Sequence, residues 1–92
     1  MADPPITQEA FDRLLSWLDP DRDRARERYE MIRRKLIVFF ASRGGDSPEE
    51  MADECINRVM KKLPEIEQQY TGSPGNYFLG VAKVIAWEWQ RI

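Results

Sequence analysis

The stretch from residue 47 to 64, SPEEMADECINRVMKKLP, carries the pattern that most restricts how this chain can fold. Its apolar residues recur every four positions, with two more beside them, and this spacing places them on one side of an α-helix. Ser47, with Glu50 three residues later, predicts a capping box at the start, Pro48 suits the first helical position, and Pro64 predicts the end. The predicted buried stripe consists of Met51, Ala52, Cys55, Ile56, Val59 and Leu63.

Two helices are predicted before this stretch. Thr7 can cap a first helix over about 8–18. Asp19-Pro20 predicts the start of a second helix, which should run to about Arg43 and end at Gly44-Gly45, because glycine adopts the left-handed conformation without penalty. Their predicted apolar stripes are Phe11, Leu14, Leu15 and Leu18 in the first, and Ala25, Tyr29, Ile32, Leu36, Phe39 and Phe40 in the second.

The C-terminal third of the chain predicts a loop and one more helix. Residues 64–76, PEIEQQYTGSPGN, have the composition of a loop, and Ser73-Pro74 repeats the cap-and-proline start signal. The expected apolar stripe of the last helix is Phe78, Val81, Ile85, Trp89 and Ile92. No strand-like alternation occurs, so the sequence predicts an all-α, compact bundle of about four helices over residues 7–92, preceded by a flexible tail, residues 1–6.

Composition excludes several classes of function. The chain has 92 residues, no His and one Cys, so the commonest general base, the commonest metal ligand and an intramolecular disulfide are all missing. No glycine-rich phosphate loop or nucleophile elbow occurs, and we expect neither an enzyme nor a metal or cofactor site. No apolar run approaches the roughly 20 residues of a membrane span, and the N-terminus does not resemble a signal peptide. The sequence therefore predicts a cytoplasmic protein without membrane insertion.

Charge is segregated along the chain. Residues 19–45 carry eight basic and five acidic side chains, whereas residues 46–67 carry three basic and seven acidic ones. The simplest interpretation of both segments is a solvent-exposed surface without a binding function, with local ion pairs such as Glu54–Arg58 on the later helix. The rival interpretation is a surface for a partner, either nucleic acid on the basic segment or a protein on the acidic one.

Two helix patterns in order carry a resemblance to a known family. RRKLIVFFASRGGDSPEEMADECINRVMKKL, followed by a loop and NYFLGVAKVIAWEWQR, resembles region 2 of bacterial RNA polymerase sigma factors of the sigma-70 family. The most similar type is the small extracytoplasmic-function class, and the resemblance covers about residues 25–92. It implies a transcription initiation factor domain that docks on core RNA polymerase and recognises the promoter −10 element.

The resemblance implies two binding surfaces. The first would meet the coiled coil of the polymerase β′ subunit and consists of Glu50, Asp53, Glu54, Asn57 and Arg58. In this surface Asp53 stands where the family usually has Gln. The second would hold the non-template strand of the −10 element, on the 64–76 loop and the following helix. It consists of Tyr70, Ser73, Asn76, Tyr77, Phe78, Lys83, Trp87 and Arg91.

Departures from the family leave alternatives open. Val84 and Glu88 replace the usual Asn and Asp, and Lys83 and Arg91 are few cations for DNA affinity. The family's second domain, a helix-turn-helix that reads the −35 element, has no counterpart before Ile92, so we expect a fragment or a free-standing region 2 domain. One alternative is a sigma-like adaptor that binds another protein, for example an anti-sigma or other regulatory partner, without promoter recognition. A second is a small helix-turn-helix DNA binder, which predicts a more basic recognition helix than any present here.

Overall fold

The computed structural model describes residues 7–90. These residues fold into four α-helices joined by short turns. They confirm the prediction of an all-α bundle of about four helices, whereas the predicted tail, residues 1–6, lies outside the described part. Among residues 7–90, no helix combines the length and the apolar character that a membrane span requires. The helices are α1 (Gln8–Leu18), α2 (Arg22–Ser42), α3 (Pro48–Ile66) and α4 (Pro74–Gln90).

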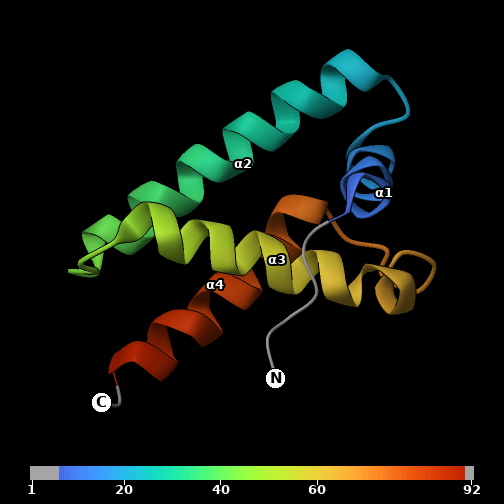
Figure 1. Cartoon of the computed structure of the whole chain (residues 1–92). Coiled ribbons are helices and arrows are strands. Elements are labelled where there is room, and N and C mark those ends of the chain that lie inside the picture. The colour runs from blue at the N-terminus through green and yellow to red at the C-terminus, as the bar shows by residue number, and fades with distance from the viewer. Residues whose placement is uncertain (1–6, 91–92) are drawn as a thin grey trace.

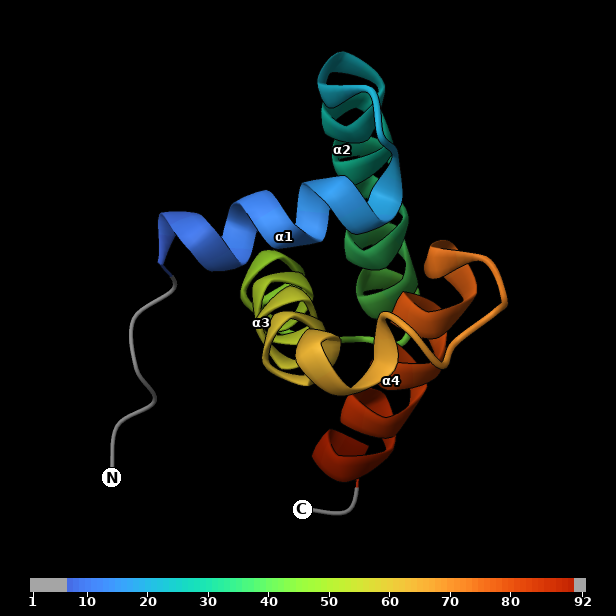
Figure 2. The ribbon, with the colours of Figure 1, turned by 90° about the vertical axis from the view of Figure 1, so that its right-hand side faces the viewer.

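The helices are arranged around α3. Helix α2 is the longest, and α3 returns beneath it toward α1 (Figure 1). Helix α1 crosses the end of the bundle where α2 begins and α3 ends (Figures 1 and 2). Helix α4 starts near α1 and runs away from it, in contact with both α2 and α3. The α3–α4 loop therefore lies beside the C-terminal end of α1.

The core confirms most of the predicted apolar stripes. All six residues of the predicted α3 stripe are buried, and Met60 joins them. Helix α2 buries Ala25, Leu36 and Phe40, while Tyr29, Ile32 and Phe39 pack partly buried against them. Because α3 supplies seven buried side chains, its backbone is held on one side by the whole bundle. The opposite side of α3 is therefore a rigid platform of polar residues.

The start of α1 agrees with the sequence prediction, whereas the start of α2 does not. Thr7 caps α1 as expected, with its Oγ1 accepting a hydrogen bond from the Ala10 amide at 3.1 Å. The prediction that Asp19-Pro20 opens the second helix is wrong. Asp21 is the N-cap of α2, and its Oδ1 accepts from the amides of Asp23 (2.9 Å) and Arg24 (3.1 Å). Asp19 instead stabilises the preceding turn by accepting from the Asp21 amide.

Both ends of α3 correct local predictions. The predicted capping box is wrong, because Ser47 makes no side-chain cap hydrogen bond, although Pro48 does occupy the first turn. Pro64 does not end the helix, which continues to Ile66 and shortens the predicted 64–76 loop to residues 67–73. The chain stays helical past the proline because Ile66 packs against the core, and the Glu67 amide donates to the Leu63 carbonyl at 2.9 Å.

Helix α4 starts at the predicted Ser73-Pro74 signal but buries a different stripe. The prediction that Trp89 belongs to the core is wrong, because this side chain is 50% exposed. Ala82 and Ala86 are buried together with Phe78 and Ile85, so these four side chains form the inward stripe of α4. Val81 is partly buried, and the predicted Ile92 lies outside the described residues.

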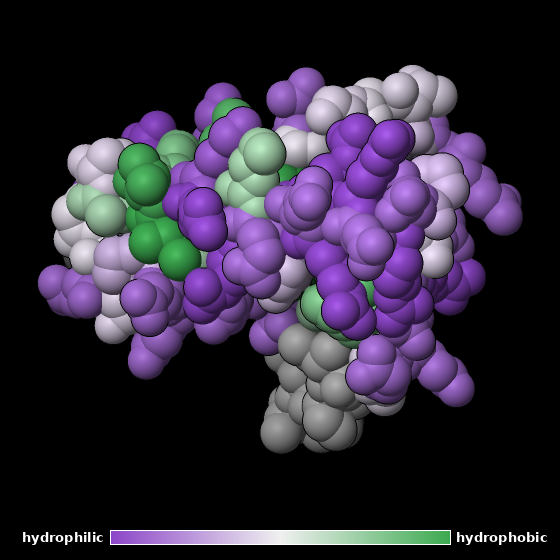
Figure 3. Space-filling view, turned by 90° about the horizontal axis from the view of Figure 1, so that it is seen from above, coloured by the Kyte–Doolittle hydropathy of each residue, from purple (hydrophilic) through white to green (hydrophobic). Residues whose placement is uncertain are grey.

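The basic segment of α2 is tied to neighbouring elements. Arg22 pairs with Asp12 of α1, and Arg28 pairs with Asp19 at 3.1 Å. These pairs link α2 to α1 and to the end of α1 at Asp19, so part of the positive charge is neutralised within the domain. Seen from above, the surface is mostly hydrophilic, with hydrophobic patches, the most prominent at the left of the view (Figure 3). Over the described part of the chain, the exposed large apolar side chains are Met31, Val38, Leu79, Val84, Trp87 and Trp89.

Candidate functional site

The outer side of α3 forms a shallow polar hollow. All five residues of the predicted polymerase-docking surface line it, together with Lys61, and we call this set the α3 polar face. They lie together because positions 50, 53, 54, 57, 58 and 61 share one side of a single helix, opposite the buried stripe. Its lining is Glu50, Asp53, Glu54, Asn57, Arg58 and Lys61.

Ion pairs connect the α3 polar face to both flanking helices. Arg33 of α2 donates from Nε to Asp53 at 3.2 Å. Arg58 is shared, since its guanidinium contacts Glu88 of α4 at 2.8 Å and Glu54, one turn earlier on α3, at 3.3 Å. The hydrogen bond to Glu88 is the largest cause of the raised pKa of Arg58. Asp53 and Glu54 are therefore paired within the domain while their side chains stay partly exposed.

The Arg58–Glu88 pair predicts an acid-sensitive contact between α3 and α4. The hydrogen bond from Arg58 lowers the pKa of the Glu88 carboxyl below its ordinary value of 4.5. A carboxyl with a lowered folded-state pKa adds stability above its unfolded-state pKa and loses it as pH falls through the folded value. We expect Glu88→Gln to flatten the fall in thermal midpoint between pH 7 and pH 3, measured by circular dichroism. Glu65→Gln, a more exposed acid paired with Lys62, is the control and should leave the slope unchanged.

An aromatic cluster lies where the α3–α4 loop meets α1. Trp17 contacts Tyr77 and Phe78 with ring centroids 6.2 and 6.3 Å away, and Tyr70 contacts Tyr77 at 5.2 Å. The Tyr70 hydroxyl donates to the Ser73 carbonyl at 3.0 Å, which closes the loop on itself. Tyr70 and Tyr77 are half-buried, so each presents only part of its ring. Phe78 is 1% exposed and acts as a core residue rather than as a free stacking surface.

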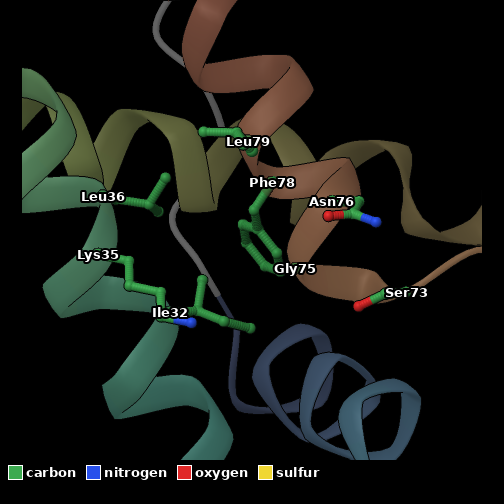
Figure 4. A pocket seen from close by; sticks show the side chains of 8 residues that line it. All are labelled: Ile32, Lys35, Leu36, Ser73, Gly75, Asn76, Phe78 and Leu79. Carbon is green, nitrogen blue, oxygen red and sulfur yellow. The ribbon is translucent and has the colours of Figure 1, made fainter.

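A groove separates α2 from the first turns of α4, and we call it the α2–α4 groove. Ile32, Lys35 and Leu36 project toward α4, and the Phe78 ring lies between the two helices (Figure 4). The hollow has a volume of about 250 Å³. Further lining residues come from the loop end and from α4, namely Ser73, Gly75, Asn76 and Leu79. Three residues predicted to contact DNA, namely Ser73, Asn76 and Phe78, thus line this groove.

The remaining predicted DNA residues lie on the outer side of α4. Lys83 and Trp87 are four positions apart and are both exposed, Trp87 by 57%. Val84 is exposed beside them by 50%. Arg91 lies outside the described residues. The predicted DNA surface is therefore divided between the aromatic cluster, the groove rim and the outer side of α4.

The single cysteine is a core residue. Cys55 is fully buried, and its thiol donates to the Phe78 carbonyl at 3.3 Å, which links α3 to α4. Burial raises the pKa of the Cys55 thiol to about 12. Thiolate is the reacting species, so we expect an aromatic disulfide reagent at pH 8 to react with the native chain about 1,000-fold more slowly than with free cysteine. Equal rates in native and urea-unfolded chain would contradict this prediction.

Within residues 7–90, no group of His, Cys, Asp and Glu side chains could hold a metal ion.

Several contributing residues were not predicted. Trp17 organises the aromatic cluster, but its only sequence signal is a position beside the apolar stripe of α1. Lys35 lines the groove and Glu88 holds Arg58, yet both meet residues far away in the chain. Comparison with protein-family models, curated proteins and solved structures gives no match for this chain. The resemblance to sigma region 2 therefore rests on the quoted residues alone.

Proposed function

We propose that this chain is a non-catalytic transcription initiation domain of the sigma region 2 type. It would dock on core RNA polymerase through the α3 polar face and contact the promoter −10 element through the α3–α4 loop and α4. The observation that carries the proposal is the α3 polar face itself. All five residues assigned to docking line one open hollow, on the side of α3 opposite its seven buried side chains.

The geometry of this face suits a charged helical partner. Its carboxylates are fixed on a helix that the whole core supports, so little conformational entropy remains to be lost on binding. Asp53 and Glu54 keep side-chain exposures of 56% and 42% while paired internally, which leaves further acceptor capacity on each carboxylate. Arg or Lys side chains of a coiled coil could make charge-assisted hydrogen bonds there, and these would fix the orientation of the complex.

The proposed promoter surface carries fewer charged side chains than the α3 polar face. Lys83 and Trp87 on the outer side of α4 could contact a phosphate and stack on an unpaired base, respectively. Tyr70 and Tyr77 offer ring edges beside the 67–73 loop, where an extruded base would have to enter. Cation and aromatic contacts of this kind favour single-stranded over duplex DNA.

One observation favours the adaptor as the second candidate. Lys83 is the only cation in α4 (Pro74–Gln90), and exposed Val84 and Trp87 lie beside it. An apolar surface with little positive charge suits a protein partner better than a phosphate backbone. In this function the α3 polar face and the outer side of α4 would both bind regulatory proteins, without promoter recognition.

A single titration series tests both candidates. The chain, labelled with 5-fluorotryptophan, gives one fluorine resonance for each of its three Trp residues, assigned with Trp→Phe variants. Titration with core RNA polymerase is expected to broaden all three resonances, since a large complex tumbles slowly. Adding a single-stranded −10 non-template oligonucleotide at low salt to the free chain is expected to shift Trp87 in particular. Absence of both polymerase binding and a DNA response would refute the proposed function and favour the adaptor, whereas polymerase binding without any DNA response would refute the promoter role alone.

A further inference from the structure

The α2–α4 groove continues beyond the hollow of Figure 4. A second hollow adjoins it, lined by Leu18 of α1, Met31 of α2 and Pro74, and both hollows share Ile32, Lys35, Ser73 and Gly75. On α2, Met31 borders only the second hollow and Leu36 only the first, so the two hollows succeed each other along this helix. The groove therefore offers two apolar sockets, one on each side of Lys35.

The charged side chains that line this groove are all basic. Neither hollow is lined by an Asp or Glu side chain, although the whole chain has a formal charge of −2. Of the two cations that line it, Arg28 is already paired with Asp19 at 3.1 Å. Among the described residues, the Lys35 ammonium has neither an ion-pair nor a hydrogen-bond partner. An unpaired cation between two apolar sockets is complementary to a ligand with a carboxylate between two apolar side chains.

We propose that the α2–α4 groove binds an amphipathic, acidic helix of a partner protein. In a helix, residues i and i+4 lie on one side about 6 Å apart along the axis, so two apolar side chains of one helix can enter two neighbouring sockets. Leu, Ile or Met at these positions would enter the sockets, and Glu or Asp at i+3 would face Lys35. Exposed Met31 (56%) and Leu79 (38%) would be covered by the same helix.

The lining favours a peptide over nucleic acid as the occupant. Sequence-tolerant binding of single strands uses exposed aromatic faces, whereas the sockets are formed mainly by aliphatic side chains and Met31. The only aromatic ring that lines them, Phe78, is 1% exposed. One unpaired cation also gives little phosphate neutralisation.

This inference goes beyond the proposed docking on polymerase, because the α3 polar face lies on another helix. It does touch the proposed promoter surface, since Ser73 and Asn76 line the groove. A helix in the groove and DNA on these two residues would exclude each other.

Matched peptides test the proposal. One fluorescein-labelled helical peptide carries Leu at i and i+4 and Glu at i+3 and i+7, and its partner carries Lys in place of Glu. Fluorescence anisotropy at low ionic strength should show the Glu peptide binding at least about ten-fold more tightly than the Lys peptide. Lys35→Glu should lose about ten-fold in affinity for the Glu peptide, and the neighbouring Arg34→Glu, whose side chain lines neither hollow, less than about two-fold. Leu79→Ala should weaken binding more than Val84→Ala on the outer side of α4.

Each contrary result would overturn the proposal in a recognisable way. Equal affinity for the two peptides, or equal effects of Lys35→Glu and Arg34→Glu, would remove the groove as the binding site. An oligodeoxynucleotide whose affinity falls in Lys35→Glu, without a corresponding effect on the peptide, would assign the groove to nucleic acid. A dimer of the chain that dissociates in Lys35→Glu, detected by light scattering, would assign it to a second copy. Polymerase binding by the wild type tests the proposed function separately.

Discussion

Phe78→Ala is expected to lower the free energy of unfolding by about 3–5 kcal/mol, the range for removing a buried aromatic ring. Phe78 is 1% exposed, contacts the Trp17 ring at 6.3 Å and belongs to the core that joins all four helices. Small domains have total stabilities of only about 5–15 kcal/mol, so this one ring accounts for a large share. Urea denaturation followed by circular dichroism at 222 nm measures the change through the shift in midpoint.

The adjacent residue supplies the control for this prediction. Leu79→Ala removes an apolar side chain from the same turn of α4, but Leu79 is 38% exposed and should cost less than about 1.5 kcal/mol. Equal midpoint shifts in the two variants would contradict the assignment of Phe78 to the core. Loss of DNA binding in Phe78→Ala, if it accompanies partial unfolding at the assay temperature, would reflect the lost packing of Tyr77 and Trp17 rather than a lost DNA contact.

Apolar periodicity predicted the core well where large and small residues alternate regularly. In α3 every predicted stripe residue is buried. Apolar residues repeated every four positions lie on one side of a helix, and that side packs into the interior. In α4 the same reasoning placed Trp89 inside, yet Trp89 is half exposed and the small residues Ala82 and Ala86 are buried instead. Periodicity identifies a face but does not tell which edge of that face a neighbouring helix will cover.

Local start and stop signals were less reliable than periodicity. Asp21 rather than Asp19 caps α2, and Pro64 lies inside α3 instead of ending it. In both places tertiary contacts decide the outcome, since Asp19 pairs with Arg28 and Ile66 packs on the core. A cap or a proline contributes about 1–3 kcal/mol, which a few buried contacts can offset.

The candidate sites also differ in how far the sequence alone could predict them. The α3 polar face could be predicted because its residues lie on one helix, where spacing alone brings them together. The aromatic cluster and the α2–α4 groove could not, since Trp17 meets Tyr70 and Lys35 meets Ser73 only after the chain has folded. Pairings over such sequence distances leave no periodic signal in a single sequence.

Charge reversal on the α3 polar face is expected to abolish most of the affinity for core RNA polymerase. Glu54→Arg places a cation beside Arg58 and removes a carboxylate from the middle of the hollow. We expect the dissociation constant to rise at least about 30-fold, as for loss of a desolvated interface charge pair. Glu65→Arg reverses an acid of the same helix outside the hollow and should change the constant less than about two-fold. Unchanged binding in Glu54→Arg would refute the docking role.

Asp53 separates the effect of charge from that of geometry at the same face. Its carboxylate accepts a hydrogen bond from Arg33, so Asp53→Gln, the residue usual in sigma factors, keeps an acceptor while removing the charge. We expect Asp53→Gln to change the affinity for polymerase less than about three-fold, and Asp53→Arg to lower it as strongly as Glu54→Arg does. Circular dichroism of each variant should show an intact helical fold, because exposed pairs of this kind contribute at most about 1 kcal/mol to stability. If Asp53→Gln instead weakens binding as much as Asp53→Arg, the partner recognises the charge itself, and a more basic surface than the polymerase coiled coil becomes the better occupant of this face.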